Sequence, residues 1–269
     1  MDERLTSETL DNLVTQFSSV WDFLRELVQN SIDAGSSSVE VWTEFEIESG
    51  ASEGVICVHV DDFGEGMSEE IIDNQLTQLF SSAKENDLTK IGKFGIGFVS
   101  VFALQPKGVL VHTGRGGECW EVFFHEDLSF TKTSIEGPVE GTQLTLFLQG
   151  DRARYAELTE RVLATLKHWC RHSETEISFE DRSALGSGEL VRINEDFAVA
   201  GELARCERDG ELEVAISYSR RPSYGFYNRG LALAYGHDGA EMLGDYAGRF
   251  RHLAFKIKSP WLEHTLSRE

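Results

Sequence analysis

The chain has 269 residues, of which 41% are hydrophobic, 26% charged and 10% aromatic, a composition typical of a folded protein with one large or two ordinary domains. Its net charge of −21 opposes binding to bare nucleic acid, although a pocket for a small anion has its own local field. The sequence contains neither a secretory signal nor an apolar run of membrane-spanning length, so we expect a cytoplasmic protein without membrane contact.

The first part of the chain predicts an alternation of helices and strands. Helical periodicity runs through 18–34, with Ser18 or Ser19 as the N-cap and Gly35 after the last turn. The further expected elements, in chain order, are strands at 39–47 and 54–62, a helix at 68–80, a mobile polar loop at 81–94, a buried helix at 95–104, strands at 108–113, 118–124 and 141–148, a long helix at 151–171 and a strand at 175–180.

The pattern changes after residue 180. The stretch "DRSALGSGE" at 181–189 is typical of a linker, and short strands are predicted at 212–219 and 224–235. We therefore expect a domain boundary near 180–190, with one domain over 1–182 and a second over 183–269. The chain ends on "EHTLSRE" without a cap or glycine, so we expect the second domain to be truncated.

The cysteines predict no covalent framework. Cys57, Cys119, Cys170 and Cys206 are far apart and form no Cys-x-x-Cys pair. This spacing favours neither a set of disulfides nor a zinc site.

Three polar side chains share one face of the first predicted helix. At 100° per residue, Glu26, Asn30 and Asp33 fall within about 60° of one another. Asparagine and aspartate are poor helix-interior residues, because their side chains compete for the backbone. The pattern fits either an ordinary solvated face or a site with a carboxylate to activate water, an amide to coordinate a metal and a second acid. The opposite face is apolar and consists of Leu24, Leu27, Val28 and Ile32.

Two glycine-containing stretches also suggest a ligand site. In "DDFGEGM" (61–67) a strand runs into an acid followed by two glycines, which allow a ligand to approach the backbone, and Asp62 could accept a hydrogen bond from an exocyclic amine. In "GKFGIGF" (92–98) three glycines precede an apolar helix, an arrangement that offers backbone N–H groups to phosphate. The spacing matches neither a Walker loop nor a dinucleotide fingerprint. Ordinary turn chemistry or glycine packing would explain each stretch taken alone.

The order of these motifs resembles the GHKL ATPases, and in particular their Hsp90 branch. "ELVQNSIDA" is similar to the N box, "DDFGEGM" to the G1 box and "GKFGIGFVS" to the G2 box, and "EGTQLTLFL" (140–148) is similar to a later strand of Hsp90. The resemblance covers most of 15–180. It implies an α/β two-layer sandwich of the Bergerat type, with a mixed, mostly antiparallel sheet and helices on one face.

The resemblance also implies roles for single residues. Glu26 matches the general base that orients the attacking water, Asn30 the ligand of Mg²⁺, and Asp62 the carboxylate that reads the adenine amino group. Residues 81–94 match the lid over the nucleotide. The other residues that would bind nucleotide are Asp33, Ala34, Gly64, Gly66, Met67, Asn74, Lys84, Gly92, Lys93, Phe94, Gly95, Ile96, Gly97, Phe98 and Thr142.

The second domain resembles the start of the Hsp90 middle, or transducer, domain. "YNRGLAL" and "SPWLEHTLSRE" carry this similarity, and on it Arg268 matches the arginine that stabilises the transferring phosphate. The alternative is an ordinary basic residue near the chain end.

Together these features predict Mg-ATP binding and slow hydrolysis to ADP and phosphate, with lid closure, a nucleotide-dependent homodimer and a chaperone activity on protein clients. One alternative is a DNA-linked ATPase of the MutL or MORC type, because "SIDAG" also resembles the MutL-like proteins. The net charge argues against nucleic acid as a partner. Another alternative is a nucleotide-binding switch without useful hydrolysis.

Overall fold

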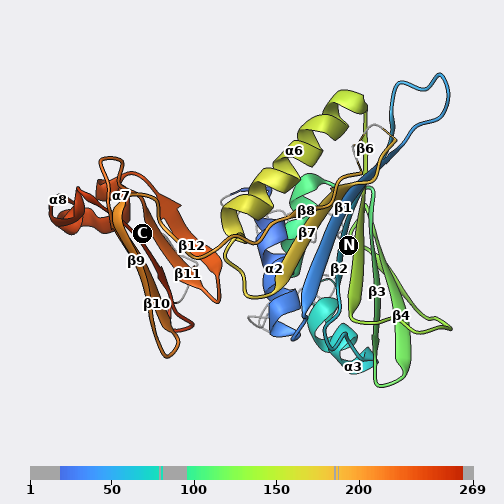
Figure 1. The fold of residues 1–269 in the computed structure, drawn as a ribbon. Helices are drawn as coiled ribbons and strands as arrows, with labels where there is room; N and C mark the ends of the chain where they lie inside the picture. Colours follow the sequence, from blue (N-terminus) through green and yellow to red (C-terminus); the bar gives the residue numbers. More distant parts are fainter. Residues whose placement is uncertain (1–18, 79, 81–95, 185, 187, 263–269) are drawn as a thin grey trace. The chain divides into compact units, whose positions relative to one another are not determined.

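A computed structural model describes residues 19–78, 80, 96–184, 186 and 188–262. The chain divides into two compact units (Figure 1). The first unit contains Met1–Thr165 and Thr175–Arg192, and the second contains Leu166–Glu174 and Ile193–Glu269. No helix of the described part is long and apolar enough to cross a membrane. The four cysteines are free thiols.

The first unit is built on one eight-stranded sheet. Its strands are β1 (Ser38–Glu46), β2 (Gly54–Asp62), β3 (Gly108–Arg115), β4 (Glu118–His125), β5 (Phe130–Ser134), β6 (Thr142–Gly150), β7 (Glu176–Asp181) and β8 (Val191–Arg192). They lie in the order β5-β4-β3-β6-β2-β1-β7-β8. All neighbours are antiparallel except β1 and β7, which are parallel. The mixed, mostly antiparallel sheet expected from the sequence is therefore confirmed.

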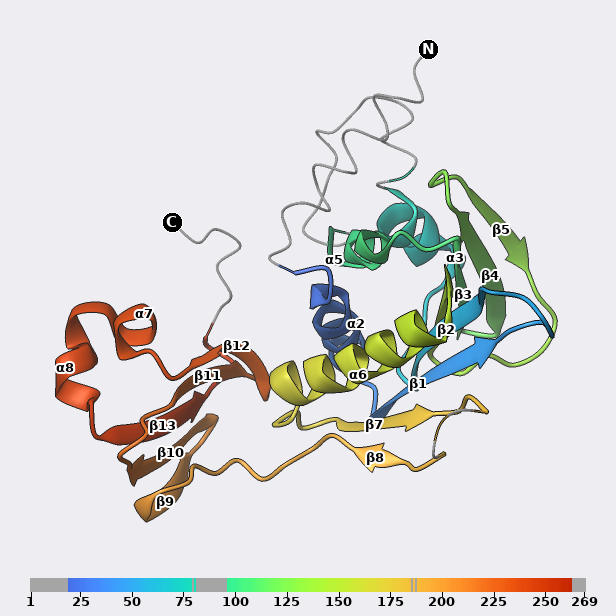
Figure 2. The same cartoon turned by 90° about the horizontal axis from the view of Figure 1, so that it is seen from above.

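Helices form the second layer of this unit. They are α2 (Asp22–Asp33), α3 (Glu69–Ile71), η1 (Ile72–Leu76), α5 (Ile96–Val99), η3 (Ser100–Leu104) and α6 (Arg152–Trp169). Both α2 and α6 lie over the same face of the sheet (Figures 1 and 2). Along each strand, every second side chain points toward this layer and is buried, as Val58, Leu146 and Val109 illustrate. The side chains between them are more exposed. The unit is thus a two-layer α/β sandwich.

Two helices differ from the sequence prediction. The helix expected at 68–80 becomes a π-helical turn at η1, because both the N–H and the hydroxyl of Thr77 donate to the carbonyl of Ile72, at 2.9 and 3.0 Å. The helix expected at 95–104 tightens into the 3₁₀ segment η3 and stops at Gln105, whose φ is 52°. Hydrogen bonds from side chains and tight packing decide these details, and hydrophobic periodicity does not report them.

The start of α2 also differs from the prediction. The helix begins at Asp22, and no side chain caps its N-terminus. Ser19 instead forms the preceding turn, in which its hydroxyl accepts the N–H of Trp21 at 3.2 Å. The prediction for the other end is confirmed, since Gly35 follows the helix with φ of 74°.

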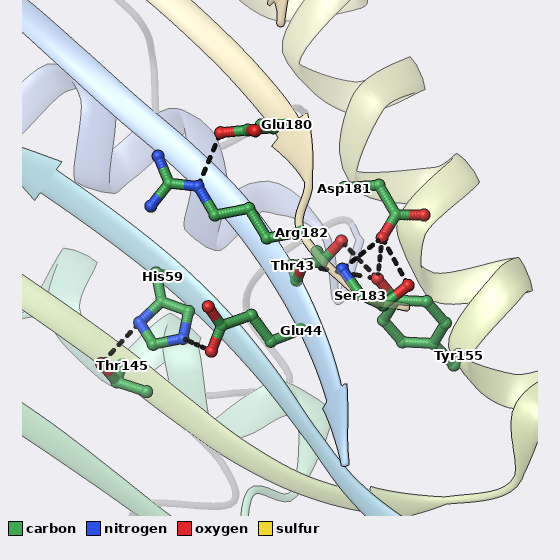
Figure 3. A network of polar contacts seen from close by, with 9 residues as sticks. All are labelled: Thr43, Glu44, His59, Thr145, Tyr155, Glu180, Asp181, Arg182 and Ser183. Carbon is green, nitrogen blue, oxygen red and sulfur yellow. Dashed lines mark hydrogen bonds and ion pairs between the residues drawn. The ribbon is translucent and has the colours of Figure 1, made fainter. Parts of the chain in front are cut away.

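A polar network joins α6 and β7 to the middle of β1 (Figure 3). The hydroxyl of Tyr155, a buried residue of α6, bonds to the Asp181 carboxylate and lies 3.1 Å from Thr43 Oγ1. Asp181 also accepts the N–H and the hydroxyl of Ser183, at 3.0 and 2.8 Å. On the opposite face of the sheet, the Arg182 guanidinium stacks on Trp42, 4.2 Å from the ring centroid. The network fixes the segment that leaves the sandwich.

The second unit contains a five-stranded sheet. Its elements are β9 (Glu202–Asp209), β10 (Leu212–Tyr218), β11 (Tyr224–Asn228), β12 (Leu231–Gly236), α7 (Gly239–Leu243), η4 (Gly244–Tyr246), α8 (Ala247–Phe250) and β13 (Leu253–Lys258). The strand order is β12-β11-β13-β10-β9, and only β11 and β13 are parallel neighbours. The strands β5, β8, β9 and β13 were not among the predicted elements.

The single strand predicted at 224–235 is wrong, because these residues form the β11–β12 hairpin. Arg229 and Gly230 make the turn, with φ of 46° and 86°. A β-carbon at Gly230 would lie 1.8 Å from the carbonyl oxygen of His172, so only glycine fits there.

Candidate functional site

The carboxylate of Asp62 is held at the end of β2. Its side chain is buried and accepts the N–H of Gly64 at 2.9 Å, the N–H of Thr142 at 3.3 Å and the hydroxyl of Ser31 at 3.3 Å. Burial raises the pKa of Asp62 above its ordinary value, and the three hydrogen bonds act in the opposite direction. These contacts fix the orientation of a carboxylate beside the C-terminal half of α2.

The loop after β2 is tied to the end of α2. The N–H of Glu65 donates to the carbonyl of Ala34 at 2.9 Å, and the N–H of Phe63 donates to the hydroxyl of Ser36 at 2.8 Å. A β-carbon at Gly64 would lie 2.7 Å from the same Ala34 oxygen. The first glycine of this motif is therefore required by the close approach of two backbones.

The second glycine packs against the ends of β3 and β6. Gly66 has φ of 64°, and a β-carbon there would lie 2.1 Å from the Gly114 carbonyl. The next residue, Met67, donates its N–H to Thr113 Oγ1 at 2.9 Å, and Thr113 lies 3.1 Å from Thr142 Oγ1. The fold thus brings Ala34, Asp62, Gly64, Gly66, Met67 and Thr142 together.

Two members of this group were absent from the sequence prediction. Ser31 bonds to Asp62, and Thr113 joins Met67 to Thr142. Ser31 stands inside "NSIDA", where its polarity on an otherwise apolar side of the helix was a usable signal. Thr113 becomes visible only through the register of β3 against β6, in which it faces Thr142.

A second carboxylate, that of Glu26, lies on α2 near the beginning of α5. Glu26 is 24% exposed, and its Oε1 accepts the Arg25 guanidinium at 2.7 Å. A β-carbon at Gly97 would lie 2.9 Å from Glu26 Oε2. One carboxylate oxygen is therefore bound by a cation, while the other faces the backbone of α5.

The remaining candidate residues are less connected. Asn30 and Asp33 are exposed on α2, and Asn74 is exposed in η1. The Phe98 ring packs in the core, 5.2 Å from the Phe124 ring centroid, so it could meet a ligand only through its backbone. Ile96 is the first residue of α5. Lys84, Gly92, Lys93, Phe94, Gly95, Arg268 and the expected lid at 81–94 lie outside the described residues.

Comparison with known proteins matches the first part of the chain to one class of ATPases. Residues 18–145 match the family "Histidine kinase-, DNA gyrase B-, and HSP90-like ATPase". The chain is 28% identical to the chaperone protein HtpG of Bacteroides fragilis over 211 residues, which is 71% of this chain and 31% of that protein. It is also 28% identical to HtpG of Rhodospirillum rubrum over 226 residues, 72% of this chain and 34% of that protein.

A solved structure shares the fold alone. The crystal structure of the N-terminal domain of a DNA repair protein aligns with a TM-score of 0.51 and 14% identity, and covers 96% of this chain and 86% of that one. Residues 18–145 are thus similar to the GHKL ATPases, and Hsp90-like HtpG proteins are among the chain's relatives. It spans about a third of the length of the curated relatives it matches.

Proposed function

We propose that this chain binds Mg-ATP between α2, the end of β2 and the beginning of α5, and hydrolyses it slowly to ADP and phosphate. The observation that carries the proposal is the pair of carboxylates on this frame. Glu26 has one oxygen beside the backbone of Gly97, and Asp62 is buried and oriented by three donors. Two carboxylates held at two places on this frame suit two tasks, one at the phosphates and one at the base.

Asp62 would recognise adenine. An ionised carboxylate accepts a hydrogen bond from an exocyclic amine, and a keto oxygen in the same place would be repelled. Ser31, Gly64 and Thr142 hold the acceptor in position, so little conformational freedom is lost when the base binds. This predicts preference for adenine over guanine nucleotides.

Glu26 would act as the general base. It would accept a proton from the water that attacks the γ-phosphate, while Arg25 fixes its orientation through the 2.7 Å contact to Oε1. The phosphates would lie along the backbone at Gly97, where no side chain stands between them and the backbone.

The polar side chains around this site suit Mg²⁺ bound together with phosphate better than a metal ion bound by protein ligands alone. The described residues contain no cluster of three His, Cys, Asp or Glu side chains that could hold a metal ion. Mg²⁺ usually takes one or two protein oxygens together with phosphates and waters, and the exposed amide of Asn30 supplies such an oxygen. The ion would offset phosphate charge, and chelation should abolish turnover.

The wider activity is proposed from the relatives. HtpG is named a chaperone, and we propose the same role here, on protein clients and in a nucleotide-dependent homodimer with lid closure. In this proposal 1–182 is the ATP-binding domain, 183–269 is the first part of a middle domain, and Arg268 contacts the γ-phosphate. The DNA-linked alternative is supported by a shared fold at 14% identity, and a net charge of −21 opposes it.

Steady-state turnover tests the proposal. We expect slow, Mg²⁺-dependent ATP hydrolysis that falls about a hundredfold or more in Glu26→Gln, whereas ADP affinity stays within about threefold. Glu48→Gln, at an exposed glutamate in the β1–β2 loop, is the matched control and should leave turnover unchanged.

The other outcomes separate the alternatives. If wild type and Glu26→Gln both bind ATP and neither hydrolyses it, the chain is a nucleotide switch. If turnover survives in Glu26→Gln, the assignment of the base is wrong. A rise in turnover per chain with protein concentration would support the homodimer.

A further inference from the structure

The second unit contains a basic cavity that shares no residue with the proposed ATP site. It has a volume of about 610 Å³ and is lined by residues of 198–201, 219–223, 235–237 and β13. Four of its eleven lining residues are basic, namely Arg220, Arg221, His237 and Lys256, and none is acidic. The whole chain has 46 acidic residues against 25 Lys and Arg and 8 His, so a cavity of this composition departs from the rest of the molecule.

Lys256 is the buried cation of this cavity. It is 8% exposed, and its Nζ lies 2.7 Å from His172 Nε2. The carbonyl of Glu195 accepts the Nδ1–H of that ring at 3.1 Å, so Nε2 is the acceptor for the lysine. Burial and the Lys256 charge lower the pKa of His172 to about 4, and the imidazole is therefore neutral.

The lysine has no carboxylate partner among the described residues. The contrast is Lys258, two residues on along β13, which is paired with Glu213 at 2.6 Å and with Glu174 at 3.6 Å. In the described structure the only hydrogen bond of Lys256 Nζ is the one to His172, which leaves two of its three N–H donors unused. A buried ammonium without an ion-pair partner is costly, and an anion in the cavity would reduce this cost.

Two exposed guanidinium groups stand at the same cavity on a fixed turn. The hydroxyl of Ser219 accepts the N–H of Arg221 at 3.1 Å and donates to its carbonyl at 2.8 Å. The opposite wall is anchored where Ser217 donates to the carbonyl of Ala200 at 2.8 Å. The side chains of Arg220 and Arg221 form no ion pair within the described chain, so both are available to a ligand.

We propose that this cavity is a binding site for a small anion with phosphate groups, distinct from the ATP site. A guanidinium pair gives fork-shaped donors to phosphate oxygens, and the buried ammonium supplies a point charge deeper in the cavity. Several cations on one side favour a ligand with several charges, and a phosphate monoester or pyrophosphate group carries these in a compact volume. The Nδ1–H of His237 donates to the Pro222 carbonyl at 3.0 Å and holds the ring at the cavity, where Nε2 can donate to the anion in the imidazolium form.

The test is a calorimetric titration of the full chain with inorganic pyrophosphate at constant ionic strength, in which variants of the cavity separate this site from the ATP site. We expect saturable one-to-one binding that weakens about tenfold or more in Arg220→Ala/Arg221→Ala. Lys256→Met should weaken it further. The double variant is at exposed positions, so it should fold normally and bind ADP as wild type does.

The matched control is Arg205→Ala/Arg208→Ala, which removes the same charge from exposed positions of β9. It should bind pyrophosphate as wild type does. Equal losses in both double variants, or no loss in Arg220→Ala/Arg221→Ala, would overturn the site. Tighter binding of citrate than of pyrophosphate would overturn the ligand class.

Discussion

The backbone of Gly97 lies so close to Glu26 that a β-carbon at this position would be 2.9 Å from Oε2. The two residues are 71 positions apart in sequence, and their contact joins α2 to the beginning of α5. Each motif is ambiguous alone. Their contact places the carboxylate beside a stretch of backbone that carries no side chain.

A substitution at this glycine should affect catalysis more than stability. In Gly97→Ala the new methyl group meets only the end of the Glu26 side chain, which can move, and alanine favours a helix. We expect the free energy of unfolding to change by less than about 1 kcal/mol, while ATP turnover falls about ten- to a hundredfold because the base is displaced. Gly248→Ala, at a helical glycine with open space around it, is the control. If Gly97→Ala and Gly248→Ala have equal turnover, the position of Glu26 does not determine the rate of ATP hydrolysis.

The stability of the chain should depend on pH through Asp61. Burial, Glu40 and Asp62 raise the pKa of Asp61 from 3.8 to about 7. Between these two values the folded state holds a proton that the unfolded state has released, so stability falls as pH rises from about 4 to 7 and then levels off. Asp61→Asn should remove this slope and raise the free energy of unfolding at pH 8 by about 1 kcal/mol, a value reduced for partial exposure.

Urea denaturation at pH 5 and pH 8 measures this effect. Asp209→Asn, at an exposed aspartate of β9, provides the reference. A stabilisation by Asp61→Asn that is the same at both pH values would contradict the titration and indicate ordinary packing.

The network around Asp181 should contribute to stability without affecting the nucleotide. Tyr155→Phe removes the hydroxyl that bonds to Asp181 and Thr43 in a buried position. We expect a loss of about 1–2 kcal/mol in the free energy of unfolding, with ADP affinity unchanged. Tyr246→Phe, at an exposed tyrosine of η4, should cost nothing measurable. No loss in Tyr155→Phe would mean that water replaces the hydroxyl.

The sequence predicts the parts of this protein that depend on local pattern. Strands β1 and β2 follow the alternation of apolar residues almost to the residue, and Gly35 marks the end of α2. The grouping of Asp62 with its glycines and Thr142 came from motif order. Local pattern fails where long-range contacts decide, as at Gly230, whose turn depends on the carbonyl of His172, and at Thr113, whose role depends on sheet register.

The central claim is that an adenine nucleotide binds at Asp62, and calorimetric titration of Mg-ADP and Mg-GDP tests it most directly. We predict saturable binding of ADP and much weaker binding of GDP. In Asp62→Asn the affinity for ADP should fall about tenfold or more. The control Asp61→Asn changes the neighbouring carboxylate, which points to the opposite face of β2, and should bind ADP as wild type does. Absence of ADP binding to wild type, or equal affinity in Asp62→Asn, would contradict the account.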